Sequence, residues 1–186
     1  MKIEKYNNIA IILHWLIAII IILQLGCGLW MTDAIKNEET RKVAYEFYKY
    51  HKSFGLLILI LSLTRLIWRF YHKPPQMPKN MTKIEIFLAN STHIILYFLI
   101  IAIPFSGWLM TSSSSFGIAT MFFGLFEWPQ ISFIAELSNK EELNKIFNIS
   151  HALISRLLIF LLILHILAAL KHQFINKDKL INKILP

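Results

Sequence analysis

Four long apolar segments constrain the fold of this 186-residue chain more than any other feature. The first, residues 9–31, contains no Asp, Glu, Lys or Arg and, as a helix, is long enough to cross about 30 Å of hydrocarbon. The other three are residues 53–71, 86–110 and 146–170, whose only charged residues are Arg65, Arg69 and Arg156. A hydrophobic content of 56% and a mean hydropathy of +0.55 are too high for a soluble domain of this size. The sequence therefore predicts an all-α integral membrane protein, a four-helix bundle that forms one domain over residues 1–186.

The first apolar segment is expected to stay in the mature protein as an anchor. Lys2 and Lys5 precede it, as basic residues precede a signal peptide, but the apolar run is longer than a signal peptide's and no small-residue cleavage site follows it. Cys27 lies alone in this segment, so a disulfide within the chain is excluded.

The loops predict the orientation. With four spans, both termini lie on one side of the membrane together with the proline-rich turn between the second and third spans. That side carries the basic residues Lys2, Lys5, Arg69, Lys73, Lys79, Lys83, Lys171, Lys177, Lys179 and Lys183, whereas the opposite loops combine basic residues with most of the acids. The positive-inside rule then places both termini in the cytoplasm. The net charge of +8 is explained by lysines that meet anionic lipid, so nucleic acid is not needed as a partner.

Histidines inside the apolar segments point to a cofactor, because imidazole is costly in hydrocarbon unless it has a partner. His151 and His165 are fourteen residues apart in one segment, which puts them on one helix face and about 21 Å apart along the axis. His14 and His51 begin two other apolar runs. The predicted topology matches His51 with His151 near the outer side and His14 with His165 near the inner side. Neutral imidazole is a good axial ligand for haem iron, so the pattern predicts two haem b groups with these four histidines as iron ligands.

A single intramembrane histidine is more often a hydrogen-bonding group between helices than a ligand, and His93 is assigned such a polar role. Arg65, fourteen residues after His51, comes near the level of the inner haem, where its guanidinium is a candidate partner for a propionate. His172 follows His165 by seven residues and is either a proton relay or an ordinary interfacial histidine. Residues 111–150 form a long connection whose apolar run MFFGLFEWPQISF is expected to lie at the outer interface as a short amphipathic element.

At these residues the chain resembles the bacterial cytochrome b561 family of four-helix, di-haem b membrane cytochromes. The stretches that carry the resemblance are ILHW, YKYHKSFG, RLIWR with the proline-rich turn after it, STHIILYFLIIAIPFSGWLM and HALISRLLIFLLILHILAALKHQF. His14, His51, His151 and His165 match the family's four haem-ligand positions. The resemblance implies a multi-pass protein of the bacterial cytoplasmic (inner) membrane. It also implies an oxidoreductase that transfers electrons between a donor and membrane quinone, and some family members look like superoxide oxidases that reduce ubiquinone.

If that activity applies, superoxide or another donor reacts near the outer haem and quinone is reduced at the inner end, where His172 and Lys171 are candidates for quinone binding or proton delivery. Arg65 is a third candidate there. Positive charge near the outer haem would attract superoxide. The candidates for that charge are Arg41, Lys49 and Lys52, while Glu127, Glu136, Glu141 and Glu142 make the other outer loop acidic.

Two other functions are compatible with the sequence. A cytochrome b subunit that anchors a hydrogenase- or formate dehydrogenase-like partner would take electrons from an iron–sulfur protein docked on the outer loops, and it would co-purify with that partner. A histidine-lined metal transporter would bind copper or zinc with the same imidazoles. Few intramembrane carboxylates are present to support transport.

Overall fold

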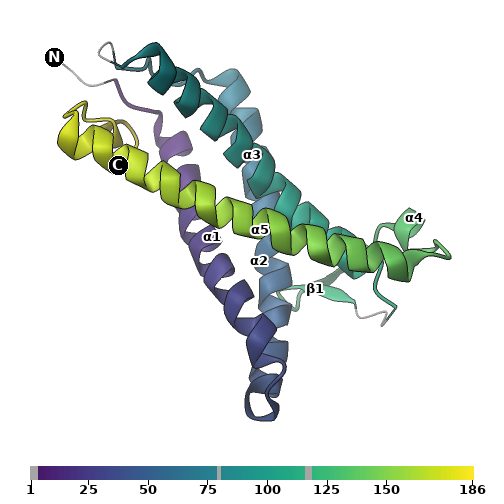
Figure 1. Ribbon diagram of the computed structural model, residues 1–186. Coiled ribbons are helices and arrows are strands. Elements are labelled where there is room, and N and C mark those ends of the chain that lie inside the picture. The colour runs from purple at the N-terminus through teal and green to yellow at the C-terminus, as the bar shows by residue number, and fades with distance from the viewer. Residues whose placement is uncertain (1–3, 79–80, 116–118) are drawn as a thin grey trace.

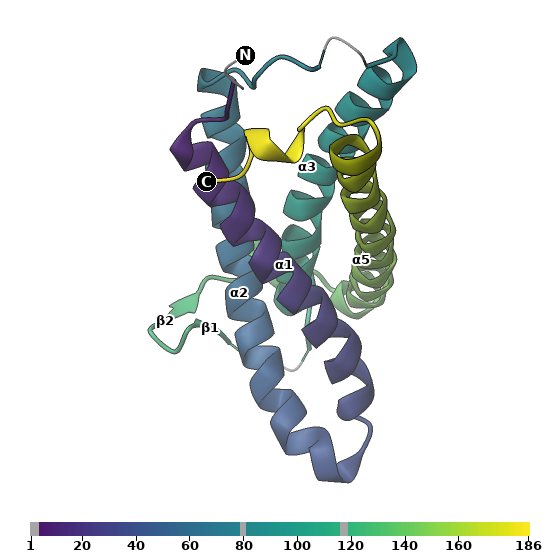
Figure 2. The same ribbon diagram turned by 90° about the vertical axis from the view of Figure 1, so that its left-hand side faces the viewer.

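The computed structural model describes residues 4–78, 81–115 and 119–186. Its long helices are α1 (Asn8–Ala34), α2 (Glu38–Tyr71), α3 (Lys83–Ser112) and α5 (Lys140–Leu170). Each is long and apolar enough to cross a membrane, which confirms the predicted all-α membrane fold. Both ends of the chain and the connection from α2 to α3 lie at one end of the bundle (Figure 2). We call this end the terminal end and the other the distal end.

The helices pack as a chain of neighbours. The closest pairs are α1 with α2, α2 with α3, and α3 with α5 (Figure 1). A small core at the centre joins all four helices through Ile17, Ile58, Leu99 and Leu158. Many of the other large apolar side chains are exposed, as expected of helices that face lipid. Helix α5 approaches α1 and α2 less closely than it approaches α3.

Helix α2 begins well before its apolar segment. The side chain of Asn37 accepts a hydrogen bond from the Glu39 amide, and Glu38 and Glu39 place negative charge at the positive end of the helix dipole. No Pro or Gly interrupts residues 38–54, so the helix continues into the apolar segment. His51 is therefore inside α2 and not at its end, because hydropathy defines where a helix enters lipid and not where it starts.

The connection between α3 and α5 is mostly not helical. It contains a two-stranded antiparallel hairpin of β1 (Thr120–Phe122) and β2 (Phe126–Trp128), followed by the short helix α4 (Ser132–Ala135). Phe123 and Gly124 have positive φ angles of 50° and 75°, which suit the tight turn between the strands. The expected amphipathic element is thus a hairpin in its first part. Exposed Leu125 and Phe126 form its tip.

Ser53 attaches this hairpin to α2. Its hydroxyl donates to the Met121 carbonyl at 2.9 Å and accepts from the Phe123 amide at 3.1 Å. We expect Ser53→Ala to remove both bonds and to destabilise the protein by about 1–2 kcal/mol, seen as a lower Tm and faster proteolysis of residues 119–131. Ser62→Ala is the matched control, because Ser62 is equally buried in α2 and its hydroxyl has no hydrogen-bond partner in the described chain. Equal effects of the two substitutions would contradict the anchoring role of Ser53.

Candidate functional site

The distal half of the bundle brings His51 of α2 and His151 of α5 face to edge. Their ring centroids are 6.5 Å apart and their planes are inclined by 74°. Two imidazoles that share one metal ion each place a nitrogen about 2 Å from it, so their centroids lie about 6 Å apart. The observed spacing therefore suits one metal ion between the two rings, as the sequence predicts for the outer pair.

The ring of His151 is oriented by α3. Its Nδ1 lies 3.1 Å from the Ile103 carbonyl and 2.9 Å from the Ser106 hydroxyl. A carbonyl only accepts, so Nδ1 must carry the proton and donate it. The Ser106 hydroxyl donates to the same carbonyl at 2.7 Å and offers its oxygen to Nδ1. This arrangement fixes the tautomer in which Nε2 has a free lone pair, as a metal ligand requires.

His51 has a buried polar atom that nothing in the described chain satisfies. Its Nδ1 is inaccessible to solvent and has no hydrogen-bond partner. The His51 ring also borders a cavity of about 510 Å³ between α1 and α2, lined by Gln24, Cys27, Trp30, Tyr50 and Phe54 among others. That volume is within the range of about 300–1,000 Å³ for small-molecule sites. An unpaired imidazole beside an apolar cavity fits a ligand to a buried cofactor.

Each ring of the outer pair also lies against a glycine of a neighbouring helix. A Cβ atom added to Gly28 of α1 would lie 3.4 Å from Cε1 of His51, and one added to Gly107 of α3 would lie 3.5 Å from Cε1 of His151. These are ordinary contacts, so alanine would fit. A larger side chain at either position would press on the ring.

The terminal half holds a second group of histidines, from three helices. His93 of α3 and His165 of α5 have ring centroids 5.5 Å apart, with planes inclined by 78°. His14 of α1 is within electrostatic range of both of them and of Arg65. The predicted partner of His165 is His14. The structure adds His93 to the same cluster.

Arg65 of α2 lies near this cluster and also bonds to Tyr97 of α3. Its Nε donates to the Tyr97 hydroxyl at 3.0 Å, and its guanidinium lies within electrostatic range of His14 and His165. The structure thus brings Arg65 to the level of the inner histidines.

Beyond His165, the helix widens and places His172 in a polar environment at the terminal end. Residues Lys171–Ile175 form a π-helix, η1, a geometry that is frequent at functional sites. His172 is buried, and its Nδ1 lies 2.7 Å from Oδ2 of Asp178. Because a carboxylate only accepts, Nδ1 carries the proton and Nε2 is the acceptor. The adjacent Lys171 forms a salt bridge of 3.0 Å with Glu85 of α3.

Comparison with known proteins decides the family. The chain matches the prokaryotic cytochrome b561 family over residues 5–186. The chain belongs to this family. It is similar to "Cytochrome b561 homolog 2" of Escherichia coli (strain K12), with 30% identity over 98% of this chain and 92% of that protein. It is also similar to "Probable superoxide oxidase CybB" of Yersinia pestis, with 28% identity over 98% and 97% of the two chains. This cytochrome is thus a multi-pass bacterial membrane protein for electron transport, and its family implies that it binds haem b.

The arrangement of nitrogen donors in this cytochrome suits haem better than a bare metal ion. Within residues 4–78, 81–115 and 119–186, no group of three or more His, Cys, Asp or Glu side chains could hold a metal. Structural zinc needs four protein ligands, whereas a porphyrin supplies four of its own and needs only two axial ligands. Histidine pairs, an orphaned His51 nitrogen and a neighbouring apolar cavity fit the haem b that the family implies.

The sequence predicts a polar role for His93 without naming its partner, and it does not identify Asp178. The structure places the ring of His93 against that of His165. The depth of His93 in the third apolar segment could have indicated this contact, but the other four intramembrane histidines account for each other in two pairs of matching depth. Asp178 could not be identified from the sequence, because it lies in a polar stretch after the apolar segment. Only the turn after η1 brings it back to His172.

Proposed function

We propose that this cytochrome holds two haem b groups, one near each side of the membrane, and passes electrons between a donor at the distal end and quinone at the terminal end. The observation that carries the proposal is the placement of His151 and His165 on α5. They are about 21 Å apart along that helix; the ring of His151 lies 6.5 Å from that of His51, and His165 is within electrostatic range of His14. When bound, haem b supplies one-electron oxidation and reduction at its iron.

The side chains have distinct roles in this proposal. His51 and His151 hold the outer haem, and the bonds of His151 to Ile103 and Ser106 keep Nε2 free for the iron. His14 and His165 hold the inner haem. Arg65, within range of both of them, offers its terminal nitrogens to a propionate, since its Nε is already bonded to Tyr97.

The fit of haem into the helix packing supports these pairs. Each pair joins α5 to α1 or α2, and α5 packs less closely against these helices than against α3. A flat macrocycle needs separation between the helices that ligate it. The pairings place the haems where that separation exists.

We infer that superoxide is the donor and ubiquinone the acceptor, an assignment supported by the relative named as a probable superoxide oxidase. The balanced reaction oxidises two superoxide anions to two dioxygen molecules. One quinone takes up the two electrons and two protons and becomes quinol. Of the basic residues expected to attract superoxide, Lys49 is neutralised in part by Glu46 at 2.6 Å, which leaves Arg41 and Lys52 as the stronger candidates.

The His172–Asp178 pair is the proposed proton donor for quinone at the terminal end, which we assign to the cytoplasmic side because basic residues gather there. Asp178 accepts the Nδ1 proton of His172 and orients its ring. Nε2, the acceptor nitrogen, takes up a proton from the aqueous side and passes it to quinone. Lys171, next to His172, is held by its salt bridge to Glu85, and its ammonium is a candidate hydrogen-bond donor to quinone.

The first experiment is the dithionite-reduced minus air-oxidised spectrum of the purified protein, with haem quantified per chain. The proposal expects a b-type α-band and about two haems per chain. A well-folded preparation with no haem would overturn it. Quinone reduction driven by enzymatically generated superoxide then tests the donor, and haems that reduce with quinol but never with superoxide would restrict the proposal to another donor.

We expect Asp178→Asn to lower the rate of quinone reduction by about 10–100-fold at unchanged haem content, because general acid catalysis typically contributes about 10²–10⁴-fold. Stopped-flow mixing separates haem reduction at the distal end from haem reoxidation by quinone, and only reoxidation should slow. Asp33→Asn is the matched control, since Asp33 is an exposed carboxylate at the distal end, paired with Lys36. Unchanged reoxidation in Asp178→Asn would exclude the pair from proton delivery.

A further inference from the structure

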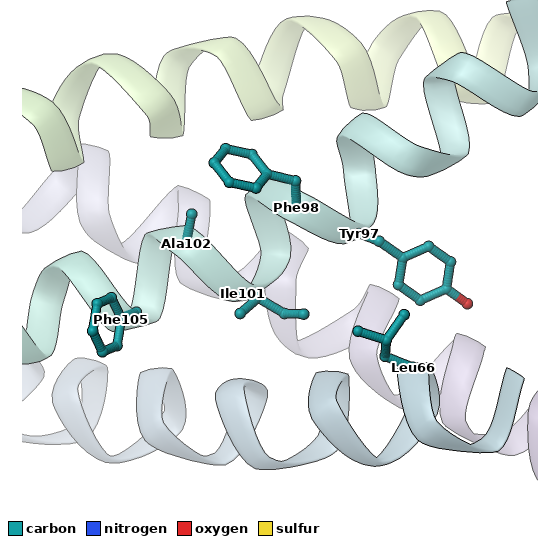
Figure 3. Close-up of a pocket in the computed structure, with 6 residues that line it drawn as sticks. All are labelled: Leu66, Tyr97, Phe98, Ile101, Ala102 and Phe105. Atoms are coloured by element: carbon teal, nitrogen blue, oxygen red, sulfur yellow. The ribbon is translucent and has the colours of Figure 1, made fainter. Parts of the chain in front are cut away.

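An apolar groove runs along the outside of the bundle between α2 and α3. Its volume is about 370 Å³, and its lining consists of Leu66, Tyr97, Phe98, Ile101, Ala102 and Phe105 (Figure 3). Successive turns of α3 form its length. Phe98 and Phe105 are exposed, so the groove is open to lipid and is separate from the histidine pairs.

The end of the groove nearest the termini is polar and positively charged. Arg65 donates to the Tyr97 hydroxyl at 3.0 Å, and the guanidinium carbons of Arg65 and Arg69 lie 5.7 Å and 5.4 Å from the centre of the Tyr97 ring. Neither arginine forms a salt bridge with a carboxylate in the described chain. Two like charges four residues apart on a helix repel each other, and they do so more strongly beside hydrocarbon than in water. The haem propionate proposed for Arg65 would leave the charge of Arg69 uncompensated, so this end of the groove calls for a second anion.

The position of the charges along α2 indicates where that anion comes from. Arg69 lies two residues before the last residue of α2, Tyr71, at the end of the bundle that holds both termini. Its side chain is half-buried and can reach the headgroup layer of that leaflet. The apolar groove extends from there toward the middle of the membrane. Basic pockets between transmembrane helices commonly bind the headgroups of anionic phospholipids.

We propose that this groove binds one anionic phospholipid from the leaflet on the terminal side. Its phosphate accepts hydrogen bonds from Arg69 and from the Tyr97 hydroxyl, whose proton is free because Tyr97 is the acceptor in its bond with Arg65. One acyl chain lies along Phe98, Ala102 and Phe105. A quinone head group is neutral and would leave the charge of Arg69 uncompensated, which favours the lipid.

The test uses native mass spectrometry of the delipidated holoprotein in detergent. It is titrated with dioleoyl phosphatidylglycerol or with dioleoyl phosphatidylcholine, which has the same chains and no net charge. Phosphatidylglycerol should bind at one site about ten-fold more tightly than phosphatidylcholine. Arg69→Gln should remove most of this preference, since one charge-assisted bond is worth about ten-fold in affinity. Ala102→Phe should weaken both lipids by filling the groove, and Lys73→Gln, which removes an exposed cation at the same end outside the groove, should change neither.

Several outcomes would overturn the proposal. Equal affinity for the two lipids, or an unchanged preference in Arg69→Gln, would show that the arginine does not recognise the phosphate. Displacement of the lipid by millimolar inorganic phosphate would show an ion site without a role for the groove. Displacement by decylubiquinone at lower concentration than the lipid would assign the groove to quinone. The haem spectrum and Tm of every variant confirm that it is folded.

Discussion

His151→Ala is expected to reduce the haem content from about two per chain to about one and to abolish electron transfer from the distal end. His151 is the better-defined ligand of the outer pair, because Ile103 and Ser106 fix its tautomer and its ring lies 6.5 Å from that of His51. Alanine removes the iron ligand and leaves space in a half-buried site. The haem that remains should reduce with quinol but no longer with the donor. Pyridine haemochrome analysis and low-temperature spectra measure the two effects.

The proposed pairing also predicts how much haem a double variant loses. If His51 and His151 share one haem, His51→Ala should remove the same spectral component as His151→Ala. The double variant should then lose no more haem than either single one, as expected of residues that act as a unit. His72→Ala is the control, since His72 is exposed just after α2 and stacks on Trp68. Loss of the same component in His14→Ala and His151→Ala would show that the pairing is wrong.

The sequence is most informative where lipid imposes the structure. Charge-poor segments of sufficient length must be helices in a membrane, so the four spans could be predicted without knowledge of their packing. The proximity of His51 and His151 is also predictable, because both lie near the start of spans that cross the membrane in the same direction. Arg65 reaches the inner histidines for the same reason, by its depth.

The features that could not be predicted depend on contacts between distant parts of the chain. The hairpin of residues 120–128 is fixed by the Ser53 hydroxyl, some 70 residues away, and an apolar run of that length does not by itself distinguish strand from helix. Asp178 meets His172 only because the chain turns after the π-helix. Depth alone also cannot distinguish His14 from His93 as the partner of His165, because both lie at a similar level in the membrane.

That ambiguity leads to the second prediction of large effect: His14→Ala should remove the inner haem, whereas His93→Ala should retain it. His93 and His165 lie on α3 and α5, which pack closely, and their rings touch at a centroid distance of 5.5 Å. Close packing leaves little room for a macrocycle between those rings. His14 and His165 come from helices that pack less closely, so a haem plane fits between them.

The two variants are a matched pair, because each removes one imidazole from the same cluster. His14→Ala should lower the haem content to about one per chain and remove the spectral component that His151→Ala leaves intact. His93→Ala should keep two haems and shift the midpoint potential of the inner one, since a polar group near its ligand is lost. Redox titration followed in the α-band measures both results. If His93→Ala loses the haem and His14→Ala keeps it, then α3 supplies the inner ligand and the pairing by depth fails at that site.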